Sequence, residues 1–396
     1  MRGRFRVPMK RIRELDGLRF LAIFAVLLVH YRPPSRPGWN FLSLGWVGVD
    51  LFFAISGFLI TTILVSLRGS RNPYRVFYWR RTLRIFPPYY AVLLPLSLAI
   101  VLSHAQVAAH LTIEAWVFLL SLTGLSHQIH GALLVLLHGV PLNTARTAVE
   151  NHLFASYGDG IFVFWSLSVE ELFYLMWAPI VLRCSRRQLL TISLAAIAVC
   201  PVLRVLFHTP LYPECFSFVC RFDSLMMGSL LSLLFIACKR GEISQPALKR
   251  GLNAGLAISL VCLAVLCAYS GLFNGLEIRT ALSFSAFGYS LLGILFASVV
   301  GICAIHAESG LWWAAILGAR PLVYIGTISY TMYLIHIPVW VTIYKLISIL
   351  QGREATPGLI LILLSVTTTI ALAAISWRFV EKPILRFKDA AFANRQ

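Results

Sequence analysis

Charged side chains are scarce in this sequence. Asp, Glu, Lys and Arg make up only 13% of the 396 residues, whereas hydrophobic residues make up 59%. A soluble domain carries about 25% charged residues, so this composition excludes a soluble globular protein and favours one embedded in a lipid bilayer. Acidic residues are the scarcest charged class: there are 16 Asp and Glu against 34 Lys and Arg, which gives a formal net charge of +18.

Several other features are absent. The basic residues lie between apolar runs and form no continuous stripe or known binding motif, so we expect no nucleic-acid partner. The eight cysteines show no paired ligand spacing and lie mostly in apolar segments, so we interpret them as small packing residues and predict no metal site. No low-complexity linker, internal repeat or extra soluble domain is evident. We therefore predict a single membrane domain over 1–396, with its first apolar run retained rather than cleaved.

The apolar runs predict an all-α, polytopic membrane protein with about ten transmembrane helices. The predicted spans are 13–31, 44–67, 85–103, 162–182, 189–207, 217–238, 251–272, 281–306, 321–349 and 358–379. Between the third and fourth spans, two short apolar runs within 104–160 favour a re-entrant segment. Most Lys and Arg fall on one side of this arrangement, including the basic N-terminus 1–13 and the tail at about 380–396. The positive-inside rule therefore predicts that both termini are cytoplasmic in the inner (plasma) membrane.

The first span carries three ionisable residues that a simple membrane anchor would not need: Asp16, Arg19 and His30. Arg19 and His30 are eleven residues apart, which places them on one helix face and about 16 Å apart along the axis. Charged groups within a bilayer are costly, so their presence favours a wet or protein-lined path. The alternative is an interfacial His at one end and a snorkelling Arg at the other.

Four stretches then carry a recognisable pattern. They are LDGLR at 15–19 with His30, GVDLFFAISGFL at 48–59, RRTLRIFP at 80–87 and WSLSVEELFY at 165–174. Weaker matches follow at 221–223, 329–336 and 379–383. In their order and spacing these stretches resemble the acyltransferase-3 family of membrane O-acyltransferases, over nearly the whole chain.

The resemblance implies transfer of an acyl group, often acetyl, from cytoplasmic acetyl-CoA or another acyl-CoA to a hydroxyl of a carbohydrate or glycosylated acceptor on the extracytoplasmic side. Transfer to an alcohol needs a base, and the neutral imidazole of His30 suits that role at pH 7. His30 acts either as the base alone or as a transient acyl carrier. Glu170 is expected to orient His30 and to stabilise its imidazolium. The alternative for Glu170 is an acid in the first turn of a helix capped by Ser166 or Ser168.

The donor is expected to meet arginines. Arg81 and Arg84 form the family's RxxR pair on the predicted cytoplasmic side, where guanidinium groups can bind the phosphates of coenzyme A. Ordinary positive-inside charge is the alternative. Arg19 lies deeper on the same route and is expected to contact the donor or to complete the active site, with Asp16 as its ion-pair partner.

The remaining polar residues fall into two groups. We expect Trp165, Ser166, Ser168, Tyr174 and Asp50 near the acceptor, although Trp165 also suits an interfacial anchor and Asp50 an interhelical contact. Ser329, Tyr333 and His336 share one face of the 321–349 helix. They are interpreted, with Asp16, as structural polar residues.

Two other functions fit parts of the pattern. One is a proton-coupled transporter or exporter, in which intramembrane Asp, Arg and His side chains form a relay. Transporters often contain inverted repeats, and none is evident in this sequence. The other is an acyltransferase that modifies a secreted natural product such as a macrolide.

Overall fold

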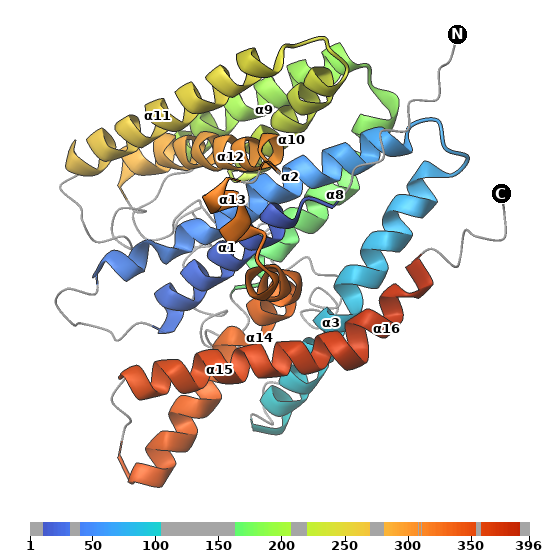
Figure 1. Ribbon diagram of the computed structural model, residues 1–396. Coiled ribbons are helices and arrows are strands. Elements are labelled where there is room, and N and C mark those ends of the chain that lie inside the picture. Colours follow the sequence, from blue (N-terminus) through green and yellow to red (C-terminus); the bar gives the residue numbers. More distant parts are fainter. Residues whose placement is uncertain are drawn as a thin grey trace, which may run out of the picture. The chain divides into compact units, whose positions relative to one another are not determined.

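The computed structural model describes residues 11–31, 40–103, 163–206, 220–269, 281–307, 309, 311–353 and 358–388. Within this part of the chain the structure is helical and has no strand (Figure 1), which confirms the predicted all-α class. The predicted re-entrant segment at 104–160 lies outside the described residues. So do most of the basic N-terminus and the end of the C-terminal tail.

The chain divides into two compact units. The first draws on Met1–Tyr78, Phe173–Cys215 and Val219–Tyr333, and the second on Trp79–Leu172, Phe216–Phe218 and Leu334–Gln396. The first unit contains α1 (Arg13–Tyr31), a 3₁₀ helix (Asn40–Val47), α2 (Gly48–Leu67), α9 (Arg186–Leu206), α10 (Phe222–Lys239), α11 (Gln245–Tyr269), a π-helix (Phe284–Gly288), α12 (Tyr289–Ile305) and α13 (Trp312–Leu317). Three helices contribute residues to both units: α3 (Pro73–Ser103), α8 (Trp165–Arg183) and α14 (Arg320–Gln351). The second unit also holds α15 (Leu359–Ser376), a π-helix (Trp377–Glu381) and α16 (Lys382–Leu385).

The core of the first unit lies among α1, α2, α10, α11 and α12. Helices α2 and α10 pack closely within it, with Gly57 and Gly228 each facing the other helix. A Cβ on Gly57 would overlap the carbonyl of Leu225, and one on Gly228 would overlap the carbonyl of Ala54. Small residues at such crossings let two backbones pack in direct contact, which is a common source of attraction between membrane helices.

The outer helices of the first unit keep apolar side chains on their free surface. On α11, Ile258, Val261 and Val265 are each more than 60% exposed. Only 11% of the most apolar 18-residue stretch of this helix is buried. A surface this apolar is stable against lipid rather than water. Among the described residues, seven helical segments are long and apolar enough to cross a membrane, so the chain is a multi-pass membrane protein. The exact number of about ten spans stays a prediction.

A smaller core holds the second unit together. Val339 and Ile343 of α14 pack against Leu361 of α15, and the rings of Tyr89 and Phe164 lie 5.6 Å apart between α3 and the turn before α8. Both rings are buried, so this contact packs α3 against the chain just before α8.

Two helix starts differ from the sequence predictions. The third predicted span begins at residue 85, but α3 begins at Pro73, because proline is readily accommodated in the first turn of a helix. The RxxR pair therefore lies on the helix rather than before it. Helix α8 begins at Trp165, so Glu170 lies beyond its first turn rather than within it.

Candidate functional site

His30 lies near the carboxyl end of α1 and is partly buried. Its Nδ1 atom is 2.8 Å from the carbonyl oxygen of Val26, one turn earlier on the same helix. A carbonyl can only accept a hydrogen bond, so this contact places the ring proton on Nδ1. In the neutral imidazole the lone pair is then on Nε2, which makes Nε2 the basic nitrogen.

At the other end of α1, Asp16 links two arginines. Its Oδ1 is 3.3 Å from Nη1 of Arg19 and its Oδ2 is 2.8 Å from Nε of Arg11. Arg11 also donates a 2.9 Å hydrogen bond to the hydroxyl of Thr327 on α14. The ion pair between Asp16 and Arg19 that the sequence suggests is therefore present, and Arg11 connects Asp16 to Thr327 on α14.

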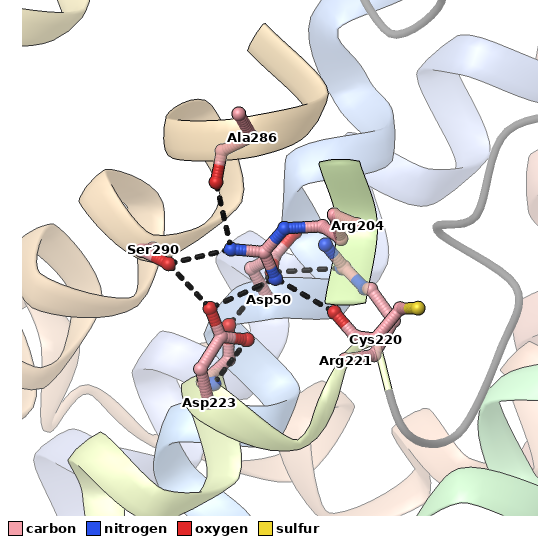
Figure 2. Close-up of polar contacts among 8 residues, drawn as sticks. Asp50, Arg204, Cys220, Arg221, Asp223, Ala286 and Ser290 are labelled. Atoms are coloured by element: carbon pink, nitrogen blue, oxygen red, sulfur yellow. Dashed lines mark hydrogen bonds and ion pairs between the residues drawn. The ribbon is translucent and has the colours of Figure 1, made fainter. Parts of the chain in front are cut away.

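A second group of charged residues is fully buried inside the first unit (Figure 2). Nη2 of Arg221 lies 2.7 Å from Oδ1 of Asp50, and Nη1 of Arg204 lies 2.9 Å from Oδ2 of Asp223. Each of these four side chains is at most 2% exposed. Two arginines thus offset two aspartates, and the group as a whole carries no net charge.

Neutral partners complete this group. Arg204 donates to the backbone carbonyls of Cys220 (2.6 Å) and Ala286 (3.1 Å) and to the hydroxyl of Ser290 (2.6 Å). Ser290 in turn donates a 2.6 Å hydrogen bond to Oδ2 of Asp223, as Figure 2 shows. A buried ion pair is tolerable only when further hydrogen bonds replace lost water, and these bonds provide that replacement.

Aromatic and hydroxyl groups hold the Arg221–Asp50 pair. The guanidinium carbon of Arg221 lies 4.1 Å from the centroid of the Tyr289 ring, a cation–π distance. Ser224 donates a 3.0 Å hydrogen bond to Oδ1 of Asp50. The two ion pairs join α2, α9 and α10, and Ser290 and Tyr289 connect them to α12. We call Asp50, Arg204, Arg221 and Asp223 the buried ion-pair network.

Of this network, Asp50 is a predicted site residue, Arg221 and Asp223 lie in the weaker match at 221–223, and Arg204 lies in none of the recognised stretches. The sequence does contain a sign of its importance: Arg204 is the one charged residue in the predicted span 189–207. Asp50 was expected near the acceptor, which stays a prediction. Its carboxylate is fully buried and already bound to Arg221 and Ser224, an arrangement that fits an interhelical contact.

The residues expected around Glu170 lie at the start of α8. Ser166 and Ser168 are buried, and their hydroxyls donate to the carbonyls of Val163 (3.3 Å) and Phe164 (3.4 Å). Both serines are thus inside the helix and bond backward, so the capping arrangement considered for Glu170 is wrong. The chain already turns at Val163 and Phe164, whose buried side chains start the helix earlier than the serines would.

Three further predicted site residues lie on α8. Glu170 and Trp165 are partly buried, and Tyr174 is 5% exposed with its backbone carbonyl accepting a hydrogen bond from the hydroxyl of Tyr78. The adjacent Glu171 interacts electrostatically with Glu170 and with Arg81. Arg81 and Arg84 are both partly buried on α3, and within the second unit Arg81 is close enough to Glu171 to interact with it.

The polar residues expected on α14 are buried. Ser329 donates a 2.9 Å hydrogen bond to the carbonyl of Gly326, the Tyr333 ring meets that of Phe52 edge to face, and His336 has no exposed surface. Their burial fits packing between helices. Among the described residues, no group of three or more His, Cys, Asp or Glu side chains could hold a metal ion.

The predicted site residues thus divide between the two units. His30, Arg19 and Asp50 belong to the first unit, whereas Arg81, Arg84 and Glu170 belong to the second. A family model described as an acyltransferase domain, of the acyltransferase-3 type, matches residues 12–378. The chain belongs to the acyltransferase-3 family. The match spans both units and includes every predicted site residue.

Similar proteins of known name point the same way as this acyltransferase-3 assignment. The chain is 25% identical to the peptidoglycan O-acetyltransferase OatA of Listeria monocytogenes and 28% identical to the putative peptidoglycan O-acetyltransferase YrhL of Bacillus subtilis. It is 24% identical to the O-acetyltransferase OatA of Staphylococcus aureus. These alignments cover 96–97% of the chain but only 56–58% of each relative. No solved structure matches the chain.

Proposed function

We propose that this acyltransferase-3 protein is a membrane O-acetyltransferase that transfers acetyl from an acyl-CoA to a carbohydrate hydroxyl. The observation that carries the proposal is the 2.8 Å contact between Nδ1 of His30 and the Val26 carbonyl oxygen, which orients the ring. We propose that Nδ1 holds the ring proton and that Nε2 accepts the proton of the acceptor hydroxyl.

The reaction then has a simple balance. Nε2 of His30 takes the proton of the acceptor hydroxyl while the hydroxyl oxygen attacks the carbonyl carbon of the acetyl thioester. The carbon–sulfur bond breaks as the carbon–oxygen bond forms, and the proton passes from the imidazolium to the departing thiolate of coenzyme A. Glu170 is proposed to stabilise the imidazolium.

The donor is proposed to bind through Arg81 and Arg84. Coenzyme A carries a pyrophosphate and a ribose phosphate, and two guanidinium groups one helical turn apart can hold such oxygens with charge-assisted hydrogen bonds. The positive-inside rule favours a cytoplasmic position for this pair, with the acceptor on the opposite side. Arg19, held by Asp16, is proposed to lie further along the donor's route.

The acceptor is proposed to be peptidoglycan or a chemically similar glycan. Three named relatives are O-acetyltransferases, and two of those names specify peptidoglycan. This part of the proposal is based on sequence similarity that covers nearly all of this chain and somewhat over half of each relative.

His30→Asn tests the base directly. The asparagine amide can reach the Val26 carbonyl as Nδ1 does, but it cannot take a proton. The full chain, purified in detergent, is incubated with labelled acetyl-CoA and peptidoglycan fragments, and acetyl ester formation is measured. We expect a loss of about 10²- to 10⁴-fold with an unchanged unfolding transition. Wild-type rates in folded His30→Asn protein would contradict the proposal.

A further inference from the structure

Three loops of the first unit meet at one end of its helices. Arg68, after α2, donates hydrogen bonds to the backbone carbonyls of Val181 and Cys184 at the end of α8. Arg186, at the start of α9, forms an ion pair with Glu242 in the loop between α10 and α11. These contacts bring the α2–α3, α8–α9 and α10–α11 connections together, although they are far apart in the sequence.

The surface formed by these loops is strongly positive. Its exposed cations are Arg71, Arg75, Arg183, Arg187, Lys239, Arg240, Lys249 and Arg250, which we call the basic end. The only acidic residue in these three described loops is Glu242, which is paired with Arg186 and also lies 4.0 Å from Nη1 of Arg240. Like charges also lie close together here, since the positive charges of Arg68 and Arg240 are near enough to repel each other. Such crowding is relieved when an anion binds.

The basic end lies where lipid phosphates are found. Helices α9 and α11 begin at this end, and their exposed apolar side chains fit contact with acyl chains. Cations at the ends of such helices stand at the boundary between hydrocarbon and water, where each Lys or Arg near an anionic headgroup contributes about 1 kcal/mol. A free phosphate or nucleotide would contact only the cations, whereas a phospholipid would also contact the exposed apolar side chains of α9 and α11.

We propose that the basic end is a binding surface for the phosphate headgroups of anionic phospholipids, with the acyl chains lying along α9 and α11. The basic end does not include Arg81 or Arg84, which belong to the second unit, and the proposal does not depend on the acetyltransferase activity.

Lipid binding to the purified full chain in detergent tests this proposal. The variant Arg71→Gln/Arg187→Gln/Arg250→Gln removes one cation in or directly after each of the three connections. The control Arg320→Gln/Lys345→Gln/Arg353→Gln removes three exposed cations elsewhere and keeps the same net charge as the variant. The measurement is saturation binding of phosphatidylglycerol, with phosphatidylcholine and inorganic phosphate as comparison probes.

We expect the wild-type chain and the control to bind phosphatidylglycerol much more tightly than phosphatidylcholine. The basic-end variant should lose on the order of 100-fold in affinity, as three such cations predict. Equal affinity for the two lipids, an equal loss in the control, or full displacement of phosphatidylglycerol by millimolar inorganic phosphate would each overturn the proposal. The unfolding transition of each variant shows that the protein compared is folded.

Discussion

The buried ion-pair network and the polar residues of α1 use similar side chains in opposite ways. In the network, Arg204 has four partners and no exposed surface, and its charge is cancelled by Asp223. On α1, Arg19 keeps 19% of its side chain exposed, and His30 is only partly buried. Charges that are enclosed and cancelled stabilise a helix bundle, whereas groups that keep some access can meet a substrate.

This contrast separates stability from chemistry, and substitutions in the two regions should therefore fail in different ways. The largest effect on stability is expected for Arg204→Met. It leaves the Asp223 carboxylate buried without its cation, which costs about 3–5 kcal/mol. Denaturant unfolding in detergent, or loss of the monodisperse species, measures this effect.

A matched pair of variants isolates the cause. Arg187→Met changes an exposed arginine on the same helix and should leave the unfolding midpoint nearly unchanged. The double variant Arg204→Met/Asp223→Leu removes both charges and should recover much of the lost stability, because an apolar pair can replace a buried ion pair. If the double variant is less stable than Arg204→Met, the network is not held together by charge compensation.

Gly57→Leu should have the next largest effect on stability. Its side chain would overlap the Leu225 carbonyl and force α2 away from α10, at a cost of about 1–3 kcal/mol. Gly251→Leu on α11 is the control, because nothing lies near a Cβ at that position. Equal unfolding midpoints for the two variants would contradict the close packing of α2 and α10.

Arg81→Ala changes a residue that is proposed to bind the donor rather than one that maintains the fold. If Arg81 binds a donor phosphate, its loss should raise KM for acetyl-CoA about tenfold, the value of one charge-assisted hydrogen bond, and should leave KM for the acceptor unchanged. Steady-state kinetics with each substrate varied provides the measurement. Arg353→Ala removes an exposed cation of the same unit and should change neither constant. A rise in both KM values for Arg81→Ala would argue against a donor site there.

The smallest effect is expected for Thr327→Val. It removes the exposed hydrogen bond that Arg11 donates to α14, at a cost of about 0.5–1 kcal/mol. Thr367→Val, on the exposed face of α15, removes a hydroxyl that bonds only within its own helix and should cost less. An identical stability for both variants would mean that the Arg11–Thr327 contact does not link α1 to α14.

Hydropathy and charge predicted most of the helices well. Each predicted span overlaps a helix of the structure, since an apolar run of about 20 residues has few alternatives in a bilayer. The boundaries that differ depend on local geometry. Pro73 opens α3 earlier than hydropathy indicates, and the turn at Val163 and Phe164 begins α8 before its serines.

The candidate site was predictable only in part. His30, Arg19 and Asp16 share one helix, so their spacing alone relates them. The pairing of Arg204 with Asp223 joins two helices whose packing the sequence does not specify, and the contact of His30 with Val26 depends on a side-chain rotation. Pattern reasoning finds residues that share an element, whereas contacts between elements need the fold.

The central claim is that His30 performs the chemistry while the buried ion-pair network maintains the fold. The most direct measurement is the amount of acetyl ester formed per folded molecule, compared between His30→Asn and Arg204→Met under one set of conditions. We expect folded His30→Asn to be inactive, and the smaller folded fraction of Arg204→Met to transfer acetyl at close to the wild-type rate. Active His30→Asn together with fully folded but inactive Arg204→Met would contradict it.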